Sequence, residues 1–492
     1  MNEVESWLRR WAGRLDQGGE AELDARANVG MFRTRRLLGT LCPRDVEQVR
    51  EIVASAVPGV SLYPLSTGHN WGLGSREPVH DGAVVLDLRR LNRVRLLDLE
   101  AGAAVVEPGV TQGRLAQLLC GSPYMLNVTA SSAHTSIIGN AVERGVGLRR
   151  QRCEDVAGLE VVLADGELVR LGSWPDADGR VVPYRHEVGP ALMPLFAQSN
   201  LGVVTAAVIR LLPRPRALRL VRLTFGAARL AAAVDELRDC RAQRLVSGVL
   251  KIYQRPDGEE CVAYCCVDGD PGLAAVACGL LLRRAADSGL FDDVRVLEDP
   301  VPGLTGGLGD GLERGPERGL RGLERGPESG LSADDEQLAE QLRRCLGGDP
   351  SCNELVLERW FGTRSDGIDA NPGGAGYLFF LPLLPFRGEA VARARVLVRE
   401  VGEETGTRWH PTVNAISCDV IDLAVSCRFP ASAATSAHRA LDLLHRRFAE
   451  HGWRPYRLDI DHMSAGGPPE VLRRLKDAFD PAGVLARGRY ER

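Results

Sequence analysis

The sequence lacks the short motifs that identify the commonest nucleotide-binding and metal-binding proteins. The glycines near its amino terminus do not have the G-x-G-x-x-G spacing of a Rossmann dinucleotide-binding domain. It contains no G-x-x-x-x-G-K-[ST] motif, which argues against a nucleoside triphosphatase. Its 12 cysteines are scattered and include no C-x-x-C pair, so we expect no cysteine-ligated metal.

The sequence also lacks an excess of positive charge, a long apolar run and a secretion signal. A net charge of −4 does not provide the excess of positive charge that is typical of nucleic-acid-binding proteins. The most apolar run, 377–386, is too short to span a bilayer and contains two prolines. The first residues form neither a basic nor an apolar region of a signal peptide. We therefore expect a protein of the reducing cytoplasm that binds neither nucleic acid nor membrane.

The length of the chain and its hydrophobic content predict a globular protein with two domains. A chain of 492 residues exceeds what one hydrophobic core usually supports. The hydrophobic fraction of 44% is ordinary for a globular protein.

Two glycine-rich segments are the most informative features that are present. In the first, 65–74, Gly68, Gly72 and Gly74 surround His69 after an apolar run. Glycine lets the backbone curl so that its N–H groups form a concavity for phosphate. The second segment, 135–147, is similarly rich in small residues. Together they predict that a dinucleotide binds between the two segments. Because the Rossmann fingerprint is absent, a flavin dinucleotide bound by another type of fold is favoured.

The first part of the chain alternates strand-like and helix-like segments. Apolar spacing predicts helices over 44–56 and 110–119. Strands are predicted at 60–64, 83–87, 103–107 and 202–212, with a hairpin of 159–164 and 168–171 around Asp165-Gly166. The two prolines of Pro213-Arg214-Pro215 interrupt the pattern directly after a predicted strand, which predicts a domain boundary near 215.

Beyond 216 the pattern changes to strands alternating with longer helices, which predicts helices layered on an antiparallel sheet. The strands are predicted at 218–225, 245–254, 262–267 and 416–427, and the helices at 227–241, 273–288, 389–404 and 432–450. Residues 303–332 interrupt this pattern with two copies of Gly-Leu-Glu-Arg-Gly-Pro-Glu. So little apolar surface cannot offset the entropy of ordering, so we predict a disordered insertion.

Four segments together resemble the vanillyl-alcohol oxidase / p-cresol methylhydroxylase superfamily of flavoproteins. They are 66–74; Val-Glu-Pro-Gly-Val-Thr at 106–111 with 136–147; Leu-Phe-Ala-Gln-Ser-Asn-Leu-Gly-Val-Val-Thr at 195–205; and the tail 452–490. In the tail Gly452-Trp453 precedes Tyr456-Arg457, and Asp-Pro-Ala-Gly-Val-Leu follows at 480–485. The segment 377–382 is similar to the cap of the 4-alkylphenol-oxidising branch.

The resemblance implies an α+β fold in which a two-subdomain FAD-binding domain of the p-cresol methylhydroxylase (PCMH) type carries a cap domain. The implied domains are an N-terminal extension at 1–39, the FAD-binding domain at 40–215, the cap at 216–455 and a segment at 456–492 that returns to the FAD site. The cap would be an antiparallel sheet covered by helices. A homo-oligomer is compatible with this reading.

The resemblance also implies the residues that hold FAD. His69 matches the position that bonds covalently to the flavin in many relatives, and Tyr377 and His410 are alternative anchors. The remaining cofactor-binding residues are predicted to be Ser66, Thr67, Gly68, Asn70, Trp71, Gly72, Pro108, Ser131, Ser132, Thr135, Ser136, Gly139, Asn140, Gly145, Gly202, Val203 and Val204.

The resemblance assigns catalysis to Tyr456 and Arg457, which would stabilise a phenolate in the alkylphenol branch. Two positions depart from that branch, because Leu73 replaces a tyrosine and Ser131 replaces an acidic residue. His134 is therefore a candidate base, since a histidine titrates near neutral pH. If the tail were a strand, Arg457 would share a face with Asp459 and Asp461, and either carboxylate would neutralise it.

These features predict an FAD-dependent oxidoreductase. It would take a hydride from an alcohol, amine or benzylic-type C–H bond of a small molecule and pass electrons to oxygen or another acceptor. A vanillyl-alcohol-type or 4-alkylphenol oxidase is an alternative, which the changes at Leu73 and Ser131 weaken. A second alternative is a flavin-binding protein without turnover, and a flavin reductase is disfavoured because no nicotinamide-binding segment is visible.

Overall fold

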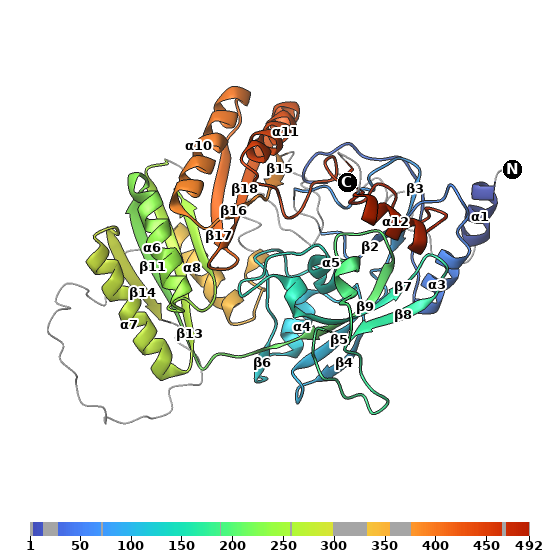
Figure 1. The fold of residues 1–492 in the computed structure, drawn as a ribbon, viewed down its shortest axis with the longest axis horizontal. Coiled ribbons are helices and arrows are strands. Elements are labelled where there is room, and N and C mark those ends of the chain that lie inside the picture. The colour runs from blue at the N-terminus through green and yellow to red at the C-terminus, as the bar shows by residue number, and fades with distance from the viewer. Residues whose placement is uncertain are drawn as a thin grey trace.

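The computed structural model describes residues 3–12, 28–69, 72–186, 188–255, 258–298, 332–354, 375–464 and 469–491. These residues form two lobes that lie side by side (Figure 1). The first lobe combines the amino-terminal part of the chain with its carboxyl-terminal end, and the second is built from the chain between them. The predicted insertion at 303–332 lies outside the described residues except for Ser332, which caps the following helix.

The first lobe begins with a small parallel sheet. Its strands β1 (Leu37–Leu41), β3 (Ala83–Asp87) and β2 (Leu62–Leu65) pair in that order. Helix α3 (Val46–Ala54) starts at Asp45, whose side chain accepts a hydrogen bond from the Gln48 backbone. Helix α1 (Glu3–Ala12) packs on the same core, because two of its tryptophans are buried and donate to the Ser55 hydroxyl.

A five-stranded sheet forms the rest of the first lobe. Its order is β4-β5-β9-β7-β8, and all its pairs are antiparallel. The elements of this part are β4 (Val94–Asp98), β5 (Ala103–Val106), α4 (Gln112–Leu118), α5 (Ile137–Val142), β7 (Val156–Val162), β8 (Leu168–Gly172) and β9 (Val203–Arg210). The two-stranded pair of β6 (Tyr124–Met125) with β10 (Leu212–Pro213) lies where the chain leaves this lobe. The predicted hairpin is confirmed as β7 and β8.

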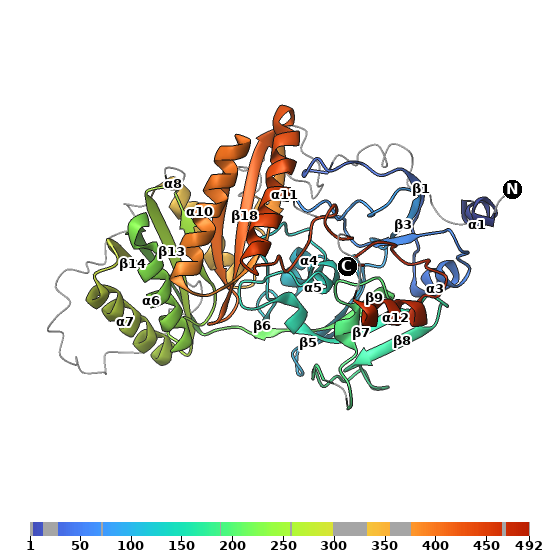
Figure 2. The ribbon, with the colours of Figure 1, turned by 45° about the horizontal axis from the view of Figure 1, so that its top comes forward.

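The carboxyl-terminal segment returns to the first lobe. Helix α12 (Glu470–Phe479) lies beside the five-stranded sheet in both views (Figures 1 and 2). After it, the chain runs next to β2, where the Leu62 amide donates to the Val484 carbonyl at 2.7 Å and the Ala486 amide donates to the Leu62 carbonyl at 2.8 Å. The segment before α12 contacts both lobes, because the Tyr456 amide donates to the Leu381 carbonyl at 3.1 Å and the Ile460 amide donates to the Leu73 carbonyl at 2.8 Å.

The second lobe is an eight-stranded antiparallel sheet. The order is β14-β11-β13-β12-β17-β18-β15, and β16 also pairs with β18. The strands are β11 (Ala217–Gly226), β12 (Leu250–Gln254), β13 (Glu260–Gly269), β14 (Asp293–Glu298), β15 (Ala375–Phe380), β16 (Leu383–Pro385), β17 (Trp409–Ala415) and β18 (Val420–Pro430). Successive side chains alternate between its two faces, so each strand contributes to two environments.

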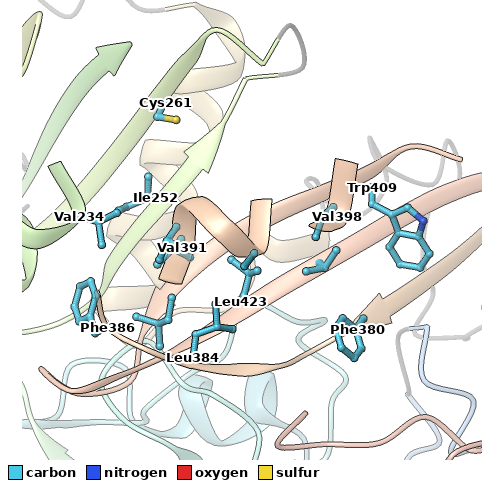
Figure 3. Packing of buried hydrophobic residues seen from close by; sticks show 14 of the residues in the cluster. Val234, Ile252, Cys261, Phe380, Leu384, Phe386, Val391, Val398, Trp409 and Leu423 are labelled. Atoms are coloured by element: carbon cyan, nitrogen blue, oxygen red, sulfur yellow. The ribbon is translucent and has the colours of Figure 1, made fainter. Parts of the chain in front are cut away.

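One face of this sheet is covered by helices and forms the largest core. Helices α6 (Leu230–Ala242), α7 (Pro271–Ser288), α10 (Gly388–Thr405) and α11 (Ala434–Glu450) all lie on it (Figure 2). Val391 and Val398 of α10 meet Ile252 and Leu423 of the sheet in the dry interior (Figure 3). Helix α8 (Ala333–Leu346) packs on the opposite face, which is otherwise turned toward the first lobe.

The predicted α+β architecture, with an antiparallel sheet covered by helices, is confirmed. The sequence prediction did not include α1, β1, β4, β6, α5, β14, β17 or α12. It also joined β18 to the turn before it, because the apolar pattern runs on from 416 while the strand begins at Val420. Among the described residues, no helix is both long enough and apolar enough to cross a bilayer.

Candidate active site

A groove with an empty volume of about 930 Å³ crosses the first lobe. Its walls come from the loop after β2, the loop that leads into α5, the start of β9 and the carboxyl-terminal segment. The lining residues that were predicted from the sequence are Ser66, Thr67, Gly68, His69, Pro108, Thr135, Ser136, Gly139, Asn140, Gly202 and Val204, together with Arg457.

The two glycine-rich loops touch each other along this groove. The Ser136 amide donates to the Thr67 hydroxyl at 3.1 Å, and the Ser136 hydroxyl donates to the Pro108 carbonyl at 2.6 Å. A Cβ on Gly139 would lie 2.4 Å from the Ser66 hydroxyl, which is closer than real Cβ contacts. Gly68 has a φ of +76°, which favours glycine. The loops can therefore approach this closely only with glycine at position 139.

A second hollow, with an empty volume of about 1590 Å³, lies between the lobes. One wall of this hollow is the eight-stranded sheet of the second lobe, or cap, on the face that is turned toward the first lobe. Every second residue of its strands points into the hollow. Lys251 of β12 pairs with Asn414 of β17, which in turn pairs with Asp422 of β18. These neighbouring positions form a polar row across three strands. Tyr253, Thr412 and Ala424 form the next row.

The two hollows meet at a small set of side chains. His69, Thr135, Asn140 and Arg457 line both of them. Any ligand that fills the groove would therefore present one end to the cavity at these residues.

Tyr456 and Arg457 stand at this meeting point because the segment that carries them is tied to both lobes. The Tyr456 amide donates to the Leu381 carbonyl of the cap at 3.1 Å, and the Gln198 side chain donates to the Tyr456 carbonyl at 2.7 Å. Burial raises the pKa of the Tyr456 phenol well above its usual value, so this group stays a proton donor.

Arg457 is held by Glu143 from the first lobe. Its Nε lies 3.4 Å from Glu143 Oε2, and Arg489 and Tyr490 also contact that carboxylate. Burial would raise the pKa of Glu143, but Arg489 and Arg457 outweigh it and keep the pKa low. The cavity is thus bordered by a cation whose position is fixed by a buried carboxylate.

Asp422 is an acidic group inside the cavity. It is 2% exposed, and Asn414 Nδ2 donates to its Oδ2 at 3.2 Å. The other oxygen, Oδ1, has no hydrogen-bond partner among the described residues. Burial raises the pKa of Asp422 to about 7, against the opposing effects of Asn414 and Lys251. A carboxyl group of this kind can accept or release a proton near neutral pH.

Comparison with known proteins identifies the type of ligand. The FAD binding domain family model matches residues 38–172. The chain is 29% identical to 1'-carboxy-chondrochloren decarboxylase of Chondromyces crocatus, over 95% of this chain and 93% of that protein. It is 27% identical to the flavoprotein subunit of 4-cresol dehydrogenase [hydroxylating] of Pseudomonas putida, over 90% of this chain and 86% of that protein.

This chain belongs to the PCMH-type family of FAD-binding flavoproteins. It is an enzyme of an FAD-dependent oxidoreductase family, which implies a substrate and an electron acceptor. The fold agrees with that of p-cresol methylhydroxylase with bound substrate, at a TM-score of 0.81, 20% identity and coverage of 99% of this chain and 97% of that one. It also agrees with 4-ethylphenol oxidase from Gulosibacter chungangensis, at 0.78, 20% identity, and 99% and 96% coverage.

The residues of the groove fit FAD. Asn140 Oδ1 is buried, has no partner among the described residues and belongs to a side chain that lines both hollows, so it offers an acceptor to a ligand. A Cβ on Gly145 would lie 2.2 Å from that oxygen, so glycine is needed for Asn140 to take this place. Ser66, Thr67 and Thr135 also line the groove, and their hydroxyls can make further polar contacts with a ligand there.

His69 is partly buried where the groove opens into the cavity. Burial, with smaller effects from His134, Arg76 and Arg89, lowers the pKa of His69 to about 3. The imidazole is therefore neutral at physiological pH and keeps a free nitrogen lone pair. Tyr377 also lines the cavity, whereas His410 is exposed and does not.

The other predicted site residues are spread over several environments. Ser131 and Gly145 line the cavity rather than the groove. Ser132 is buried and donates to Glu354 at 2.7 Å, and Val203 lies in the core of the first lobe. Gly72 touches the cap instead, since its carbonyl accepts from the Phe379 amide at 3.2 Å. Asn70 and Trp71 lie outside the described residues.

His134 is exposed and lines neither hollow among the described residues. Its ring centroid lies 6.2 Å from that of His69. Asp422 lies inside the cavity and is better placed to exchange a proton with a bound substrate. Sequence reasoning missed Asp422, although a lone aspartate in the apolar strand Val-Ile-Asp-Leu-Ala-Val was a signal. Lys251 in Leu-Lys-Ile-Tyr was a second signal of the same kind.

The predicted neutralisation of Arg457 by Asp459 or Asp461 is wrong. The tail around them is not a strand, so its residues do not share a face. Asp459 instead accepts hydrogen bonds from His445 and His462, and Asp461 pairs with Arg35 at 2.5 Å. Glu143, about 310 residues away in sequence, is the partner of Arg457.

Proposed function

We propose that this enzyme removes a hydride from a benzylic-type carbon of a phenolic small molecule. The observation that carries the proposal is the gathering of Tyr456, Arg457 and Asp422 in one cavity that shares His69 and Arg457 with the FAD groove. FAD supplies the oxidising ring that accepts the hydride at its N5.

Tyr456 and Arg457 serve to bind the phenolate oxygen. A protonated phenol and a fixed guanidinium are both donors, and a negative oxygen accepts from them more strongly than a neutral one does. Since electron density must flow from that oxygen when the benzylic hydride leaves, these donors orient the ring and stabilise its charge. Glu143 keeps Arg457 in place without entering the reaction.

Asp422 serves as the acceptor of the proton that the substrate's phenol loses when it becomes a phenolate. Its pKa near 7 leaves a substantial fraction ionised at neutral pH, and its Oδ1 is uncommitted among the described residues. This assignment replaces the acidic residue that the alkylphenol branch has where Ser131 stands here. Leu73, which stands for a tyrosine of that branch, also lines the cavity.

His69 is proposed as the covalent anchor of FAD. A neutral, partly buried imidazole at the junction of the two hollows has the nucleophilic nitrogen that a bond to the flavin ring needs. The mass of the denatured protein tests this. Wild type should carry the added mass of one FAD, and His69→Ala should not. Retention of the added mass in His69→Ala would assign the anchor to another residue, and Tyr377→Phe would be tested next.

Loss of CO2 is a second candidate outcome, because the relative from Chondromyces crocatus that matches nearly the whole chain is named as a decarboxylase. In a substrate with a carboxylate on the carbon next to the benzylic one, hydride removal leaves an electron-poor benzylic carbon. The bond to the carboxylate then breaks, its electron pair forms the new C=C bond, and CO2 leaves. The two electrons lost by the substrate are those of the hydride, so FAD is the only oxidant required.

Anaerobic mixing of the holoenzyme with phenols, benzylic alcohols and amines tests the proposed function. Bleaching of the flavin absorbance by the phenols, at one equivalent per flavin, is the expected result. Admission of oxygen, or of an artificial acceptor, then distinguishes an oxidase from a dehydrogenase by the rate at which colour returns. Measurement of CO2 in the same reaction tests the second candidate. No bleaching by any member of the panel would favour a flavin-binding protein without turnover.

A further inference from the structure

Lys251 is a cation inside the substrate cavity without a carboxylate partner. It lies on β12 and extends from the same sheet face as Tyr253. Among the described residues, no carboxylate oxygen lies within 4 Å of its Nζ, and no hydrogen bond to its ammonium is present. Its Nζ lies 6.0 Å from the centroid of the Tyr253 ring. Burial lowers the pKa of Lys251, and Asp422 partly opposes this.

The other lysine of the chain shows how such a group is normally satisfied. Lys476 Nζ lies 2.6 Å from Asp480 and also donates to the carbonyls of Asn200 and Leu485 at 2.8 and 2.9 Å. Removing an ammonium from water is costly unless such partners replace the water. Lys251 is partly buried and has no such partner among the described residues, so a ligand that displaces water from the cavity would have to bring a negative charge to offset that cost.

The remaining cations that line the cavity are already paired. Arg149 contacts Asp268, Arg150 Nε lies 2.7 Å from Asp155, and Arg457 Nε lies 3.4 Å from Glu143. Asp422 is the acidic residue among the described lining groups, and it stands two strands away from Lys251 with Asn414 between them. Lys251 therefore stands at the end of this polar row without a carboxylate in contact among the described residues.

We propose that Lys251 binds a carboxylate of the substrate, so that the natural substrate is a phenolic acid rather than a neutral phenol. This inference rests on the proposed oxidation of a phenol in the same cavity. A single ammonium matches one carboxylate, whereas a phosphate dianion would call for further free donors that the paired arginines do not offer. The row from Lys251 through Asn414 to Asp422 would then fix the acid end of the substrate relative to the base.

Matched pairs of ligands test this assignment. 4-Hydroxyphenyl-alkanoates with side chains of two to four carbons, and their methyl esters, are titrated into the oxidised holoenzyme while the flavin spectrum is recorded. The acids should bind wild type more tightly than their esters. In Lys251→Met the affinity for the acids should fall by about 30-fold or more, since a buried charge pair is lost, while the esters bind as before. Lys251→Arg should retain most of the preference for acids.

The control removes a positive charge elsewhere in the cap. Arg283 is exposed on α7, outside both hollows, and Arg283→Met should leave the affinities for acids and esters unchanged. Equal binding of acids and esters by wild type, or an equal loss of both in Lys251→Met, would overturn the assignment of Lys251 and leave the proposed oxidation intact. If neither acids nor esters perturb or reduce the flavin, the proposed function fails, and the inference fails with it.

Discussion

The Asn414 amide and the Asp422 carboxylate face each other across two paired strands, at 3.2 Å, on the wall of the substrate cavity. The contact leaves one carboxylate oxygen without a partner among the described residues. Because the carboxyl group is buried, the pKa of Asp422 rises to about 7, and the group becomes suited to accept a proton.

The first prediction is that Asp422→Asn lowers the rate of flavin reduction by about 10²- to 10⁴-fold, the usual contribution of a positioned base. In wild type the ionised carboxylate is the active form, so kcat/KM should rise with pH through about 7. Stopped-flow reduction between pH 5.5 and 9 measures both effects. A wild-type profile that shows no rise in this range, or an Asp422→Asn variant with normal rates, would remove Asp422 from the mechanism.

The second prediction is that Arg457→Ala keeps FAD but lowers kcat/KM for phenols by about 10²-fold, as expected for loss of a donor to a developing anion. The Arg457 guanidinium borders both hollows. Arg457→Lys keeps the positive charge but not the paired N–H donors of the guanidinium, so its kcat/KM should fall less than that of Arg457→Ala. Flavin content is read from the visible spectrum and turnover from product formation. Normal turnover in Arg457→Ala would contradict the phenolate-binding role.

The third prediction is that Gly139→Ala weakens FAD binding by at least about tenfold, an effect of about 1.4 kcal/mol. The added Cβ would lie 2.4 Å from the Ser66 hydroxyl and push the two loops of the groove apart. Isothermal titration of apoprotein with FAD measures the effect, provided that the apoprotein is made from the His69→Ala background.

The control for this glycine is Gly279→Ala on α7, where a Cβ would meet nothing within 4 Å. This change should leave FAD binding unaltered and raise helix stability by up to about 1 kcal/mol. In Gly139→Ala the additional change Ser66→Ala should recover part of the affinity. Unimpaired binding in Gly139→Ala would show that the loops have room to move.

The fourth prediction concerns the link between α11 and the tail. Asp459 is buried and accepts hydrogen bonds from His445 and His462, whose rings stack with centroids 3.7 Å apart. Burial opposes ionisation of Asp459, but the two histidines outweigh it and lower its pKa, while Asp459 in turn raises the pKa of His462. Asp459→Asn should therefore destabilise the protein by about 2–4 kcal/mol near pH 6.

The sign of each shift sets the pH window of that loss. The lowered pKa of Asp459 contributes stability above its unfolded value near 4, and this contribution disappears as the pH falls. The raised pKa of His462 contributes stability below its unfolded value near 6.5, and this contribution disappears as the pH rises. Chemical denaturation at pH 3, 6 and 9 should show the largest difference from wild type at pH 6. A difference that does not change with pH would argue against the charged network.

The sequence by itself determined the elements whose signals are local. Apolar spacing gave α3, β3 and the β7–β8 hairpin, and the glycine spacing around His69 and Gly139 marked the two loops that line the groove proposed for FAD. Such signals survive without tertiary information, because helix and strand periods and the conformational freedom of glycine act over a few residues.

Only the tertiary structure decided the composition of the substrate cavity. Lys251, Asn414 and Asp422 are brought into one row by the pairing of β12, β17 and β18, and Glu143 meets Arg457 because the tail returns to the first lobe. A one-residue change of strand register would turn these side chains to the opposite face of the sheet. Register depends on packing between segments far apart in the chain, so local periodicity could not place these groups together.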